Sequence, residues 1–119
     1  LKGMNNEHVV SPLNEPLFHW VIENLCKNGI DAMKGKGKIT IEVLSEADKT
    51  VVEVTDTGKG IPYNKRDEVF QPGMTSKERG WGLGLSLSKR IVKQYHNGKI
   101  WVKWSELDKG TTFRIELKQ

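Results

Sequence analysis

The sequence predicts an α+β fold: a two-layer α/β sandwich in which a mixed, mostly antiparallel sheet carries helices on one face. Apolar residues recur at the helical period in two separate stretches, residues 13–33 and 83–95. Alternation with a period of two marks two hairpins, residues 39–55 and 99–118. Hairpins that each follow a helix favour this class over a parallel sheet, and 119 residues suffice for a single domain, residues 1–119.

The first helix is predicted within residues 13–33, after a short extended segment at residues 8–10. Asn14 can cap it and Pro16 fits its first turn, while Gly35 and Gly37 end it. Its predicted apolar face is formed by Leu17, Val21, Ile22 and Leu25.

The first hairpin turns at residues 46–49, and a polar glycine turn, DTGKGIP, follows its second strand. Residues 63–70 are predicted as a short helix and residues 71–79 as a loop rich in Pro, Gly, Thr and Ser. In the second hairpin, one strand is expected to place Ile100, Val102 and Trp104 on one face, and the other places Phe113, Ile115 and Leu117.

Three alternating glycines, Gly80, Gly82 and Gly84, open the second helix. Backbone without Cβ atoms can approach a ligand closely, and the unpaired N–H groups of a first helical turn favour an anion such as phosphate. A capping loop without a ligand explains the pattern equally well. The spacing fits neither a dinucleotide fingerprint nor a G-x-x-x-x-G-K-[ST] loop.

The composition is that of an ordinary soluble globular chain. A net charge of +4, from 19 basic and 15 acidic residues that are scattered, fits a small anionic ligand better than nucleic acid. The single cysteine, Cys26, excludes an internal disulfide and suits a reducing compartment. There is no signal peptide or membrane-length apolar run, and a start at Leu1 suggests a fragment of a longer protein.

Asn24, Asn28 and Asp31 are spaced i, i+4, i+7 and therefore lie along one stripe of the first helix. A solvated polar face is one interpretation of this stripe. The other is that amide oxygens coordinate a hard cation such as Mg²⁺, which phosphate oxygens then share. The spacing alone leaves both interpretations open.

Asp56 ends a strand just before Gly58 and Gly60, where it is either a turn residue or an acceptor for an exocyclic amine such as that of adenine. Guanine has a carbonyl at that place, and an unpaired buried acceptor costs about 1–3 kcal/mol. Thr111 can join such a contact, although Thr is common in strands. Loop residues 75–77 resemble a lid that faces phosphate.

Together these segments resemble the ATP-binding catalytic domain of sensor histidine kinases, a Bergerat fold of the GHKL superfamily of gyrase, HSP90, histidine kinases and MutL. NLCKNGIDA resembles the N box and DTGKGI the first glycine box. EVFQPGMTSK resembles the F-box and lid, GWGLGLSLSKRIV the second glycine box and GTTF the terminal glycine motif. The resemblance spans nearly the whole chain.

The resemblance implies that the domain binds Mg-ATP and donates the γ-phosphoryl group to a histidine on a separate dimerisation domain of a two-component kinase. Asn28 is then the Mg²⁺ ligand, Asp56 and Thr111 hold adenine, and Asn24, Asn28 and Lys77 serve catalysis. The implied ATP-binding residues are Asn24, Asn28, Asp31, Ala32, Asp56, Gly58, Gly60, Ile61, Thr75, Ser76, Lys77, Gly82, Leu83, Gly84, Leu85 and Thr111.

ATP-hydrolysing members of the superfamily carry Glu four residues before the metal-binding Asn, but here that residue is Asn24. An amide cannot accept a proton at neutral pH, and Glu23 is turned away by about 100°. We therefore expect ATP to be held without efficient hydrolysis. The alternatives are an ATP-driven conformational switch of the gyrase and MutL type, or a nucleotide-binding module without activity.

The expected partners are ATP and ADP, the histidine-containing dimerisation domain of the parent kinase, and a response regulator downstream. His8, His19 and His96 lie in no sequence resembling a phosphoacceptor site. The isolated fragment is expected to be a monomer, and to be cytoplasmic whether or not its parent protein is anchored in the inner membrane.

Overall fold

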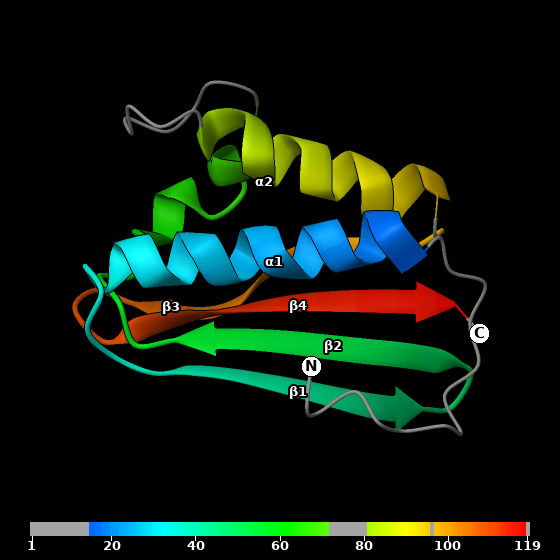
Figure 1. The fold of residues 1–119 in the computed structure, drawn as a ribbon, viewed down its shortest axis with the longest axis horizontal. Coiled ribbons are helices and arrows are strands. Elements are labelled where there is room, and N and C mark those ends of the chain that lie inside the picture. The colour runs from blue at the N-terminus through cyan, green and yellow to red at the C-terminus, as the bar shows by residue number, and fades with distance from the viewer. Residues whose placement is uncertain (1–14, 72–80, 96, 119) are drawn as a thin grey trace.

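The computed structural model describes residues 15–71, 81–95 and 97–118. Within these residues, two α-helices and four strands form the main elements (Figure 1). Their bounds are α1 Glu15–Ala32, β1 Ile39–Glu46, β2 Lys49–Asp56, α2 Trp81–Arg90, β3 Lys99–Glu106 and β4 Gly110–Lys118. None of these helices is long and apolar enough to cross a membrane.

The strands form one sheet in the order β1-β2-β4-β3, and every neighbouring pair is antiparallel. Both helices lie on the same face of this sheet (Figure 1). The predicted α+β sandwich is therefore confirmed, and all pairing among the described strands is antiparallel. The segment expected at residues 8–10 lies outside the described residues.

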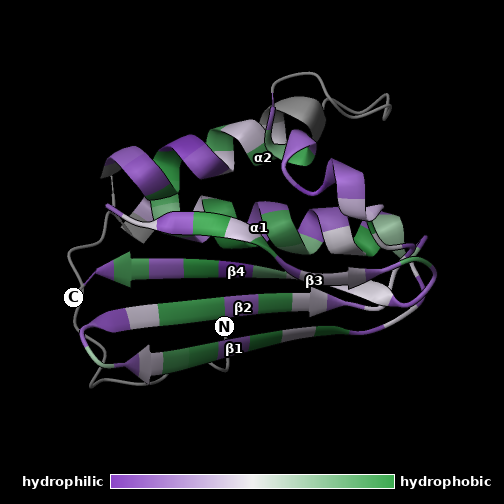
Figure 2. Cartoon of the chain, turned by 180° about the vertical axis from the view of Figure 1, so that it is seen from behind, coloured by the Kyte–Doolittle hydropathy of each residue, from purple (hydrophilic) through white to green (hydrophobic). Residues whose placement is uncertain are grey.

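The hydrophobic core lies between the helices and the sheet, and the predicted apolar faces build it. Phe18, Val21, Ile22 and Leu25 of α1 pack there against alternate residues of β2 and β4, and Leu17 lies at its border. Figure 2 shows the corresponding bands of hydrophobic and hydrophilic residues along β4 and α2. Burial of one face of each element explains why period alone predicted them.

The segment expected as one short helix is two 3₁₀ turns, η2 Tyr63–Lys65 and η3 Glu68–Phe70. The second predicted helix is also divided. Its α-helical part, α2, ends at Arg90, and a five-residue π-helical segment, Ile91–Tyr95, follows directly.

The expectation that Trp104 shares the core face with Ile100 and Val102 is wrong. A bulge breaks the pairing of β3 with β4, because Val102 pairs with Phe113 whereas Trp104 pairs with Thr112. The extra residue, Lys103, shifts the alternation by one. Trp104 is therefore 40% exposed and Ser105 is buried.

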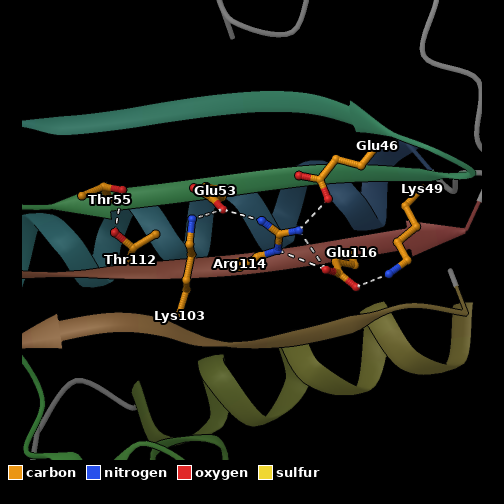
Figure 3. Close-up of polar contacts among 8 residues, drawn as sticks. All are labelled: Glu46, Lys49, Glu53, Thr55, Lys103, Thr112, Arg114 and Glu116. Atoms are coloured by element: carbon orange, nitrogen blue, oxygen red, sulfur yellow. Dashed lines mark hydrogen bonds and ion pairs between the residues drawn. The ribbon is translucent and has the colours of Figure 1, made fainter.

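A network of charged side chains covers the opposite face of the sheet and joins all four strands (Figure 3). Arg114 of β4 donates to Glu53 of β2 at 2.8 Å and to Glu46 of β1 at 3.0 Å. Lys103 of β3 reaches the same Glu53 carboxylate at 2.9 Å. Glu53 and Arg114 are also backbone partners, so the network holds β2 and β4 in register.

Candidate functional site

The candidate site begins at the end of β2, where Asp56 is buried with only 6% of the residue exposed. Its backbone partner in β4 is Thr111. The N–H of Gly58 donates to Asp56 Oδ1 at 2.8 Å, and the N–H of Thr111 also donates to this carboxylate. The carboxylate is therefore fixed in place by backbone on two sides.

Burial raises the pKa of Asp56 above its ordinary value, and the hydrogen bonds from Gly58 and Thr111 oppose that shift. A carboxylate that has lost water gains most from a ligand that donates hydrogen bonds to it. The buried carboxylate of Asp56 is therefore well suited to accept hydrogen bonds from an amine.

Two glycines allow backbone to close around this carboxylate. Gly110 has φ +144°, and a Cβ there would collide with the carbonyl oxygen of Asp56. On the other side, a Cβ at Gly29 of α1 would lie 3.0 Å from Asp56 Cβ. Gly29 was absent from the predicted site, since its importance comes from a contact between α1 and β2.

The glycine turn after β2 is tied to the end of α1. Lys59 N–H donates to the carbonyl of Ala32 at 3.2 Å, and a Cβ at Gly58 would lie 2.7 Å from that of Ala32. The predicted site residues Ala32 and Gly58 thus belong to one junction. Gly60 lies instead against the end of β3, where a Cβ would collide with the carbonyl oxygen of Glu106, and Ile61, which follows, packs against the core.

The polar stripe of α1 resolves into two different environments. Asn28 is buried, and its Nδ2 has no hydrogen-bond partner among the residues that the structure describes. Asn24, one turn earlier, donates from Nδ2 to Ser88 Oγ of α2 at 3.1 Å. Asp31 is half-buried near the end of the same helix. Asn28 is therefore the buried member of the stripe, and its Nδ2 is left without a protein partner among the described residues.

Helix α2 approaches this stripe closely. A Cβ at Gly84 would lie 2.7 Å from Asn24 Oδ1, so glycine is needed for the two helices to meet. The side chain of Leu85 belongs to the core. Gly82 and Leu83 lie in the first turn of α2, and their backbone is thus at the N-terminal end expected to favour anions. Ser88, which is fully buried, was not among the predicted site residues.

Three predicted residues, Thr75, Ser76 and Lys77, lie outside the described residues. Ser105 is a further residue that sequence reasoning missed. It receives the N–H of Ile61 at 2.7 Å and lies 2.8 Å from Thr111 Oγ1. No pattern in the sequence predicts the bulge that turns the Ser105 side chain inward.

The fold and this arrangement define a class of protein: an α+β domain in which a buried carboxylate at a strand end, a buried asparagine of α1 and a glycine-opened helix packed against α1 lie on one side of an antiparallel sheet. The sequence profile described as histidine kinase-, DNA gyrase B-, and HSP90-like ATPase matches residues 13–119. The chain therefore belongs to this family.

Individual proteins similar to this chain are consistent with this family assignment. Sporulation kinase D of Bacillus subtilis (strain 168) is 43% identical over 97 residues, which are 82% of this chain and 19% of that protein. Sensor histidine kinase ZraS of Salmonella typhi is 42% identical over 98 residues, 82% of this chain and 21% of that protein. The nucleotide-free catalytic domain of histidine kinase ThkA superimposes with a TM-score of 0.83 at 32% identity, covering 96% of this chain and 74% of that one.

These findings confirm the resemblance to histidine kinase catalytic domains. The chain spans only about a fifth of the curated relatives it matches, 19% and 21% of the two above.

Proposed function

We propose that this domain binds Mg-ATP and, within a longer two-component kinase, donates the γ-phosphoryl group to a histidine on a dimerisation domain. The observation that carries the proposal is the buried Asp56 carboxylate, held by backbone beside Thr111 in a chain of this ATPase family. A buried acceptor of this kind is suited to the exocyclic amine of adenine. Gly58, Gly60 and Ile61 then line the base.

Asn28 fits the expected Mg²⁺ ligand. Its buried Nδ2 lacks a partner among the described residues and would be available to donate to a phosphate oxygen, while Oδ1 is the atom of this amide that would coordinate the cation. A bound Mg²⁺ supplies positive charge that neutralises the phosphate oxygens. Asn24, Asp31 and Ala32 lie along the same helix and complete this side of the proposed site.

The backbone at the start of α2, residues 82–85, is proposed to meet the phosphates. The positive end of a helix favours them, and Gly84 lets α2 lie against Asn24. Thr75, Ser76 and Lys77 remain proposed lid residues, with Lys77 at the γ-phosphate.

The chemistry asked of this chain is positioning and charge stabilisation. The acceptor histidine nitrogen forms a bond to the γ-phosphorus while the bond to the bridging oxygen of ADP breaks. Asn24 cannot act as a base for water, and its amide is already bound to Ser88. The carboxylate of Glu23 is exposed and lies 3.6 Å from His19, one turn back along α1. We therefore propose slow ATP hydrolysis.

The proposed partners are ATP and ADP, the histidine-bearing dimerisation domain and a response regulator. We propose a cytoplasmic location, because ATP is supplied there, and a monomeric state for this fragment.

Calorimetric titration with Mg-ATP, combined with phosphate release in the same buffer, tests the proposal. The wild type should bind and release little phosphate. Asp56→Asn should weaken binding about tenfold or more, since it replaces a charged acceptor of the amine. Asp48→Asn, in the exposed turn between β1 and β2, makes the same chemical change far along the sheet and should bind like the wild type.

Equal affinity of the Asp56→Asn and wild-type chains would refute the assignment of the base site. Sustained phosphate release by the wild type would refute the role given to Asn24 and favour an ATPase switch.

A further inference from the structure

Ser105 occupies a junction of three segments that approach the candidate base site. It stands near the end of β3, and the bulge at Lys103 turns its side chain inward, where it is 8% exposed. Its Oγ lies 2.7 Å from the N–H donor of Ile61 and 2.9 Å from the carbonyl oxygen of Gly110. It also lies 2.8 Å from the hydroxyl oxygen of Thr111.

These three contacts can be satisfied in only one arrangement of protons. A serine hydroxyl has one proton to donate and two lone pairs that accept. Ile61 N–H must donate to Ser105, and the carbonyl of Gly110 must accept from it, which uses the only proton of Ser105. The second lone pair then accepts the proton of Thr111. If Ser105 instead donated to Thr111, two acceptors would face each other at 2.9 Å without a proton between them.

The hydroxyl of Thr111 is consequently directed toward Ser105 and offers only lone pairs elsewhere. Its backbone partner, Asp56, carries a carboxylate that also only accepts. The two side chains together form an edge of acceptors without a donor. At position 6 of a purine, an amine meets such an edge favourably, whereas a carbonyl oxygen there would face other acceptors.

We propose that Ser105 is a specificity-determining positioning residue, which fixes the Thr111 hydroxyl as an acceptor so that the site selects an amine over a carbonyl at position 6 of a purine nucleotide. This inference rests on the proposed binding of ATP. The strand end that carries Ser105 is itself held, because Arg66 Nη2 donates to the Ser105 carbonyl at 2.8 Å.

The test compares the affinities for ATP and inosine triphosphate, which carry an amine and a carbonyl at position 6 and differ also at N1, which is protonated in inosine. Purine riboside triphosphate keeps the unprotonated N1 of adenine and has only hydrogen at position 6, so its affinity relative to ATP isolates the contribution of the amine. Calorimetry on the wild type should show a preference for ATP. In Ser105→Ala the Thr111 hydroxyl loses its acceptor and can rotate to donate to the carbonyl. The ratio of the two affinities should then fall about fivefold, the value of one ordinary hydrogen bond. Ser105→Thr keeps the hydroxyl and should retain the wild-type ratio.

A purely structural role predicts a different result, an equal loss of affinity for both nucleotides in Ser105→Ala, and that result would overturn the inference. In a Thr111→Val background, Ser105→Ala should leave the ratio unchanged, because no hydroxyl remains to be oriented. Ser45→Ala, at an exposed position of β1, is the matched control and should change neither affinity.

Thr111→Val alone keeps the test decisive if Ser105→Ala fails to fold. It should lower the preference for ATP, and an unchanged preference would overturn the inference while leaving ATP binding intact. Failure of the wild type to bind ATP would overturn both proposals.

Discussion

Replacing Arg114 by methionine removes the centre of the charged network that holds β2 and β4 in register (Figure 3). The same register pairs Glu53 with Arg114 and, three positions along, Asp56 with Thr111. Glu53 is only 5% exposed, so the loss of Arg114 leaves a buried carboxylate whose remaining ion-pair partner among the described residues is Lys103. Removing one partner of a buried pair costs about 3–5 kcal/mol.

The lower end of that range is expected here, about 3 kcal/mol in the free energy of unfolding, because Lys103 continues to compensate part of the charge. The contact with Glu46 adds little, since that side chain is 48% exposed. Chemical unfolding in urea measures the loss. Lys49→Met breaks an ion pair with Glu116 from a side chain that is 47% exposed, and as a control it should cost no more than about 1 kcal/mol.

The double variant Arg114→Met, Glu53→Met isolates the pair. It removes the buried charge together with its partner and should be clearly more stable than the sum of the single variants predicts. Strict additivity, or a loss in Arg114→Met no greater than that in Lys49→Met, would refute the view that the network fixes the register.

Two other predictions concern the carboxylates of the charged network and the glycine that begins β4. In the folded protein, burial alone would raise the pKa values of Glu53 and Glu116, but hydrogen bonds and charge from Lys and Arg side chains lower both below 4.5. The stability that these two carboxylates contribute is fully present above their unfolded-state pKa values and is lost as pH falls through the lower folded values. Urea unfolding measured between about pH 3 and pH 7 should therefore show stability falling on the acid side. An unfolding midpoint that does not change with pH would contradict this. Gly110→Ala should destabilise the fold by more than about 2 kcal/mol, because backbone strain at φ +144° adds to a collision with the Asp56 carbonyl oxygen. Gly35 has φ +80° but open space around it, so Gly35→Ala should show the cost of the strain alone. Equal losses of stability for the two variants in thermal or urea unfolding would refute the role of the close contact.

The helices and strands were predictable because each turns one apolar face to the core. The strands expected in residues 39–55 and 111–118 are β1, β2 and β4 with nearly the same bounds. The helical period likewise marked the buried face of α1. These are local consequences of backbone geometry, so they require no knowledge of what the buried face contacts.

The candidate site was predictable where its residues belong to short motifs. Asn28 and Asp56 are both buried polar residues, and the structure brings Asp56 beside Thr111 across the β2–β4 pair. Their roles toward a nucleotide remain predictions, as do those of residues 75–77.

The remaining features depend on contacts between distant segments. The partner of Asn24 is Ser88, 64 residues away, and the position of Ser105 depends on a bulge that no periodicity announces. Trp104 was misassigned for that reason.

The sequence by itself determined the main helices and strands and their order, and it supplied the polar residues that are proposed to bind the nucleotide, because periodic burial and short motifs are local properties of the chain. The tertiary structure alone decided the strand order β1-β2-β4-β3, the charged network around Arg114 and the inward turn of Ser105. Each of these arises from pairing between strands that are far apart in sequence, where one extra residue in β3 exchanges the side chains on its two faces.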